Sequence, residues 1–166
     1  MERILTYAAW LLGLILVQIL ALNNIFLFGV ATPFLYIYPI LVFNRGIDRN
    51  ILMVIAFATG LVVDIFSNTP GVNAAASVLI AFMRPGLLRI HAPREEFEDF
   101  EPSIRTLGLW AFARYAFMAL LIHHTALYML EAFSFAHIGY LILRIVCSTL
   151  LTTSLVLATE FIRRRH

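Results

Sequence analysis

The chain has 166 residues, 61% of them hydrophobic and 13% charged, with a mean hydropathy of +0.89. This composition is too apolar for a water-soluble domain, so residues 1–166 are predicted to form a single transmembrane domain. The net charge of +2 would suggest nucleic-acid binding in a soluble protein. In a membrane protein such an excess is explained by orientation, so no nucleic-acid partner is expected. One cysteine, Cys147, excludes an internal disulfide.

Six apolar segments follow one another along the chain, and each approaches or exceeds the roughly 20 residues with which a helix crosses a bilayer. They cover about residues 4–22, 25–43, 50–67, 72–90, 106–130 and 137–162. The expected fold class is therefore an all-α integral membrane protein with six transmembrane helices. The first segment is longer than a usual signal peptide core and no small-residue cleavage site follows it, which favours a retained membrane anchor.

The third and fourth segments are short, and Arg84-Pro85-Gly86 interrupts the fourth. Two geometries stay open: a fourth helix that breaks near the cytoplasmic interface, with Arg84 and Arg89 extending toward it, or a re-entrant hairpin made by both segments. The turn between them, 67–73, contains Pro70-Gly71 and a potential N-cap at Asn73, so it is expected to be tight and ordered.

The segment 91–105 is the only strongly polar one in the chain. Its five acidic residues are interleaved with Phe97 and Phe100, which fall on one face if the stretch is helical. Two interpretations stay open: a solvated cytoplasmic loop, or a docking surface on which the two phenylalanines contact a cytoplasmic partner.

All twelve cationic residues are arginines, and ten of them flank or join the apolar segments. They fall before the first segment, between the second and third, around the connection from the fourth to the fifth, and after the sixth. The other three connections, 23–24, 67–73 and 131–136, contain none. Because cytoplasmic loops retain positive charge, this alternation predicts both termini on the cytoplasmic side of the membrane. Lipid is accordingly an expected partner, with Arg163, Arg164 and Arg165 near acidic headgroups.

Ionisable groups within the apolar segments are candidates for function because charge is costly in hydrocarbon. They are Asp64, Arg114, Arg144 and the pair His123-His124. Asp64 lies near the C-terminal, negative end of its helix, so it is expected to need a cationic partner, and Arg144 is the predicted one. Gly60, one turn earlier, would let that helix approach closely. The alternatives are that Asp64 extends into the outer headgroups, or that it stabilises the Asn68–Gly71 turn. A proton or ion pathway is less favoured, because a relay would need further acids at mid-membrane.

Catalytic and metal chemistry find little support in the residue pattern. Adjacent histidines point about 100° apart on a helix, and no H-x-x-x-H pattern is present. No nucleophile motif, glycine-rich phosphate loop or paired-carboxylate site occurs. No catalytic residue, cofactor or metal is therefore expected.

The first four segments contain a set of residues that resembles the bacterial rod shape-determining protein MreD family. The matching residues are Gln18, Asn23, Asn24, Thr32, Pro33, Gly60, Leu61, Asp64, Asn68, Thr69, Pro70 and Gly71. The most diagnostic piece is Gly60-Leu61-Val62-Val63-Asp64 followed by Gly71, which looks like the family's G-L-x-x-D…G signature. Segments five and six match in character only.

The resemblance implies a non-enzymatic scaffold component of the peptidoglycan-elongation machinery that binds the periplasmic scaffold MreC. It also implies that MreB, RodA and a penicillin-binding transpeptidase belong to the same assembly. The fold that it implies is similar to that of the S-components of energy-coupling factor transporters. That similarity supplies the alternative function, a substrate-binding subunit of a vitamin transporter. Such a subunit would need an outward polar pocket, for which the external loops are short.

Overall fold

The computed structural model describes residues 2–91, 100–132 and 137–165. This part of the chain is helical and contains no strand, with a single isolated bridge between Leu27 and Ala31. Its α-helices and two 3-10 turns are, in chain order, α1 (Glu2–Leu20), η1 (Leu22–Asn24), η2 (Leu35–Ile37), α2 (Tyr38–Val42), α3 (Arg49–Ser67), α4 (Val72–His91), α5 (Ile104–Leu107), α6 (Leu109–Ala132) and α7 (Ile138–Arg165).

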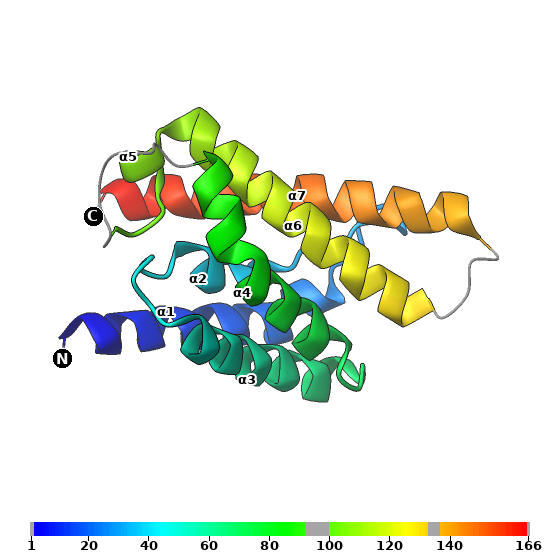
Figure 1. Cartoon of the computed structure of the whole chain (residues 1–166). Helices are drawn as coiled ribbons and strands as arrows, with labels where there is room; N and C mark the ends of the chain where they lie inside the picture. The colour runs from blue at the N-terminus through cyan, green and yellow to red at the C-terminus, as the bar shows by residue number, and fades with distance from the viewer. Residues whose placement is uncertain (1, 92–99, 133–136, 166) are drawn as a thin grey trace.

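The long helices run between two ends of a bundle, as Figure 1 shows. One end, here called the terminal end, holds both chain termini, α5 and the connection from α2 to α3. The opposite end, here called the turn end, holds the short connection from α3 to α4. The connection 43–48, which contains Arg45, and the helix α5, which contains Arg105, thus lie at the same end as the termini.

Two helices are long and apolar enough to span a membrane by length and composition, within the described part of the chain: Arg49–Ser67 and Ile138–Arg163. A shorter apolar helical stretch covers Ala9–Asn24. The described part of the chain is therefore all-helical, and these two apolar helices are compatible with membrane association. The number of six crossings and their orientation remain predictions.

The third and fourth apolar segments form two complete helices, α3 and α4, and whether these cross a membrane separately or as a hairpin stays a prediction. With 19 and 20 residues they extend for about 28–30 Å at 1.5 Å per residue. The side chain of Asp48 caps α3 by accepting hydrogen bonds from the N–H groups of Asn50 and Ile51. The fourth segment does not break at Arg84-Pro85-Gly86 as expected, because α4 continues through Pro85 to His91.

The second apolar segment, 25–43, is not the continuous helix that its hydropathy predicts. After a turn at 27–31 it runs without regular structure to the short elements η2 and α2. Phe28 and Gly29 have φ angles of 53° and 72°, which end any right-handed helix, and Pro33 has no N–H to donate. Yet the segment fills the centre of the bundle, since residues 34–42 are all buried.

Candidate functional site

The carboxylate of Asp64 lies at the turn end, where it caps the first turn of α4. Its Oδ2 accepts a hydrogen bond from the backbone N–H of Ala74 at 2.9 Å, and its Oδ1 accepts one from the N–H of Asn73 at 2.9 Å. Oδ1 also accepts from Asn73 Nδ2 at 3.0 Å and from the hydroxyl of Thr69 at 2.8 Å. Asp64 is only 3% exposed. Four donors therefore stabilise its negative charge at the positive end of the α4 dipole.

The predicted ion pair between Asp64 and Arg144 is wrong. In the described residues Arg144 pairs instead with Glu131, at 3.3 Å, and its guanidinium lies 4.3 Å from the ring centre of Tyr128. Asp64 obtains its positive partner from backbone N–H groups, so it needs no arginine. The alternative interpretation, in which Asp64 stabilises the Asn68–Gly71 turn, matches the geometry.

Gly60 allows α3 and α4 to approach closely enough for these bonds. A Cβ placed on Gly60 would lie 2.5 Å from the Cα of Ala74 and 2.6 Å from the carbonyl oxygen of Asn73. Both atoms belong to the backbone, so no side-chain rotation relieves the contact. The predicted close approach at Gly60 is confirmed, with α4 as the neighbouring helix.

The turn itself is exposed and tightly determined. Asn68 ends α3 in the left-handed conformation with φ 55°, and Gly71 has φ 80°. The backbone N–H of Asn68 donates to the carbonyl of Asp64, and that of Thr69 does so at 3.2 Å. Asn68, Pro70 and Gly71 are all exposed. Asp64 thus stabilises the exposed turn through hydrogen bonds to both its backbone carbonyl and its side chain.

A second set of polar side chains connects this turn to α1 and to the buried segment. Gln18 is fully buried, and its Nε2 donates to the carbonyl of Pro33 and to Oδ1 of Asn23, both at 2.9 Å. Its Oε1 accepts from the N–H of Leu35 at 2.8 Å. Asn23 in turn donates to the hydroxyl of Ser67, the last residue of α3, at 2.8 Å. These residues join the α1 end, the non-helical segment and the turn.

Tyr36 extends the polar contacts from Asn73 into the bundle interior. Its hydroxyl donates to Asn73 Oδ1 at 3.1 Å, accepts from the hydroxyl of Ser77 at 3.3 Å, and lies 3.2 Å from Nε2 of His123. His123 is fully buried, and its Nδ1 has no hydrogen-bond partner in the described part of the chain.

His124 contacts both the buried segment, where its ring centre lies 5.3 Å from that of Phe34, and α7. Its Nδ1 lies 2.7 Å from the carbonyl oxygen of Leu120, and its Nε2 lies 3.4 Å from the hydroxyl of Thr152 on α7. Thr152 also accepts from the N–H of Phe34 at 3.2 Å, and Ser148 accepts from that of Thr32 at 3.1 Å. No group of three potential metal ligands occurs in the described residues. The α7 hydroxyls satisfy backbone groups that have no helical partner.

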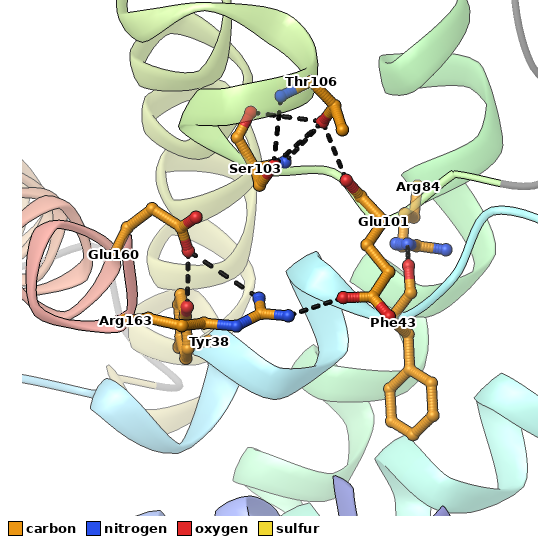
Figure 2. Close-up of polar contacts among 8 residues, drawn as sticks. All are labelled: Tyr38, Phe43, Arg84, Glu101, Ser103, Thr106, Glu160 and Arg163. Carbon is orange, nitrogen blue, oxygen red and sulfur yellow. Dashed lines mark hydrogen bonds and ion pairs between the residues drawn. The ribbon is translucent and has the colours of Figure 1, made fainter. Parts of the chain in front are cut away.

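At the terminal end, α7 is joined to the buried segment by a polar cluster that sequence reasoning missed, drawn in Figure 2. The hydroxyl of Tyr38 donates to Glu160 at 2.5 Å, and Arg163 lies 3.8 Å from the same carboxylate oxygen. Arg163 also pairs with Glu101 at 2.5 Å. Its guanidinium therefore contacts protein carboxylates, a role that the expected contact with lipid headgroups did not include.

Arg84 was expected to extend toward the membrane interface, but only 2% of it is exposed. Its guanidinium donates to the carbonyl of Leu41 at 3.2 Å and to that of Phe43 (Figure 2). Tyr115 donates to the carbonyl of Leu41 as well, at 3.0 Å. Arg84 thus satisfies carbonyl groups at the C-terminal end of the short helix α2. Arg114, by contrast, is exposed on α6.

The expected docking face of Phe97 and Phe100 is not formed as predicted. Phe100 is only 9% exposed and packs in the core, with the guanidinium of Arg45 5.6 Å from its ring centre. It therefore cannot present its ring to a partner. Phe97 lies outside the described residues. Ser103 and Thr106 form a capping box that starts α5 immediately afterwards.

No protein-family model, curated protein or solved structure matches this chain. The resemblance to MreD therefore remains a prediction from the residues quoted above.

Proposed function

We propose that this chain is a non-enzymatic scaffold of the bacterial cell-elongation machinery, as its resemblance to MreD implies. In this role it lies in the inner membrane and binds a periplasmic scaffold protein of the MreC type. The proposed docking surface is the α3–α4 turn, comprising Asn68, Pro70 and Gly71. MreB, RodA and a penicillin-binding transpeptidase are the further partners of the assembly.

The observation that carries this proposal is the convergence of residues that are far apart in sequence. Gln18 donates hydrogen bonds to both Asn23 and Pro33, and Asn23 donates one to Ser67, next to the turn that Asp64 stabilises. All of them except Ser67 belong to the set that suggested the family. These residues were selected for their resemblance to MreD and not for their position in the fold. Their grouping at one end of the bundle therefore supports a common role at that end.

The chemistry of the site favours protein docking over catalysis. The carboxylate of Asp64 already accepts four hydrogen bonds, so it is a poor base or nucleophile. The turn above it is exposed, and its conformation is fixed by a buried charge. An ordered surface binds a partner with little loss of conformational entropy.

The experiment is co-purification of the full chain with MreC from membranes, comparing Pro70→Glu with His137→Glu. Both positions are exposed, Pro70 in the α3–α4 turn and His137 in the connection before α7. Pro70→Glu should reduce MreC recovery at unchanged expression, whereas His137→Glu should not. Equal recovery of MreC with both variants would refute the turn as the docking surface.

A vitamin-transporter subunit is the second candidate, and the fully buried His123 favours it, because its Nδ1 has no hydrogen-bond partner among the described residues. A polar group inside a helical bundle is a usual mark of a small-molecule site. The same purification separates the two functions. A transporter subunit should recover an ATPase module and no MreC, while a scaffold should recover MreC.

A further inference from the structure

A second site lies at the terminal end, between the start of α3 and the C-terminal half of α4. It is a pocket of about 380 Å³ whose lining includes Arg49, Phe82, Arg89 and Ile90. It is remote from the α3–α4 turn, because α3 begins and α4 finishes at this end (Figure 1). Neither the resemblance nor the proposed scaffold role assigns it a function.

Two exposed guanidinium groups give the pocket its charge. Arg49 lies with its guanidinium 4.8 Å from the ring centre of Phe82, which holds it over the pocket. Within the described residues neither Arg49 nor Arg89 forms an ion pair, whereas Arg144 and Arg163 both pair with glutamates. The pocket thus combines two cations with no carboxylate partner in that part of the chain.

The rest of the lining is apolar and largely exposed. Phe82 is 51% exposed and Ile90 is 76% exposed. Exposing this much apolar surface to water is unfavourable, whereas contact with lipid acyl chains would bury it. A ligand that fits both halves carries a phosphate next to long hydrocarbon chains.

We propose that this pocket binds an acidic glycerophospholipid of the membrane, with its phosphate between Arg49 and Arg89 and an acyl chain along Phe82 and Ile90. Basic pockets at helix ends recognise such headgroups through charge, and the adjacent apolar surface retains the chains. The inference requires the chain to lie in a membrane, but it does not depend on a role in cell elongation.

The test purifies the full chain in mild detergent, adds phosphatidylglycerol or phosphatidylcholine, and measures bound lipid by mass spectrometry. The unchanged protein should bind phosphatidylglycerol preferentially, and the double variant Arg49→Gln with Arg89→Gln should bind it about tenfold more weakly. Arg114→Gln is the matched control, since it removes one exposed arginine from α6 outside the pocket. It should bind lipid as the unchanged protein does.

A charge-preserving pair, Arg49→Lys with Arg89→Lys, separates lost binding from lost folding, and it should retain most of the lipid. The inference is overturned if phosphatidylcholine binds equally well, or if Arg114→Gln loses as much lipid as the double glutamine variant. It is also overturned if inorganic phosphate at millimolar concentration displaces the lipid, because the pocket would then be a simple anion site.

Discussion

The negative charge of Asp64 is balanced by backbone N–H groups of α4 and not by a cationic side chain. A carboxylate near the C-terminus of a helix does need positive charge, and Arg144 is a cation expected at the same end of the bundle. The structure supplies the positive charge from the N–H groups of Asn73 and Ala74 instead. The sequence suggested that Asn73 caps the N-terminus of α4. A cap supplied by a side chain of α3 was not predicted.

Replacing Asp64 by asparagine should destabilise the protein markedly. The amide nitrogen would face a backbone N–H in place of an acceptor oxygen, so at least one buried donor loses its partner. Such a loss costs about 1–3 kcal/mol. Glu131→Gln is the control, because its partly exposed pair with Arg144 should contribute less than about 1 kcal/mol. Thermal unfolding in detergent measures both, and equal midpoints would contradict the capping role.

The same geometry predicts that Asp64→Ala and Arg144→Ala act independently. Their partners are different residues, so the double variant should lose the sum of the two single losses, within about 0.5 kcal/mol. The charge-swapped pair, Asp64→Arg with Arg144→Asp, should rescue nothing relative to Asp64→Arg. A rescued midpoint would restore the ion pair that the structure rejects.

For helices, the sequence predicts the lengths of the long elements well, because runs of apolar residues bounded by turns are local signals. The largest failure is at 25–43, while smaller ones are the break expected at Arg84-Pro85-Gly86, which does not occur, and the division of the fifth segment at Gly108. A buried non-helical segment is as apolar as a helix, so hydropathy cannot distinguish them. Gly29 and Pro33 were local hints. The groups that satisfy its backbone, such as Gln18, Ser148 and Thr152, are distant in sequence, and nothing local reveals them.

The contact between α3 and α4 gives a prediction at the same scale. Gly60→Ala should force the two backbones apart and weaken the capping of α4, because the new Cβ would lie 2.5 Å from the Cα of Ala74. Overpacking of this kind typically costs about 1–3 kcal/mol. Gly13→Ala in α1 has no atom within 4 Å of its new Cβ, so it should be neutral or slightly stabilising. Comparing the unfolding midpoints of the two variants decides whether close packing at Gly60 matters.

Over the whole molecule, the arginine pattern and the fold agree about the ends of the bundle. In the sequence, connections with arginine alternate with connections without it. In the structure, both termini lie with α5 and the α2–α3 connection at one end (Figure 1). The positions of Arg84 and Arg163 were less predictable. They bind backbone carbonyls and carboxylates contributed by 41–43, Glu101 and Glu160, which become neighbours only after folding.

Accessibility from the two sides of the membrane tests this arrangement. In a Cys147→Ser background, single cysteines replace three exposed residues: Pro70 and His137, which lie in or next to two arginine-free connections, and Gly46 in an arginine-bearing one. Because positive charge is retained in the cytoplasm, Pro70→Cys and His137→Cys should react with an impermeant maleimide added to spheroplasts. Gly46→Cys should react only after the membrane is opened. Labelling of Gly46→Cys in intact spheroplasts would reverse the orientation, and with it the periplasmic docking surface proposed at the α3–α4 turn.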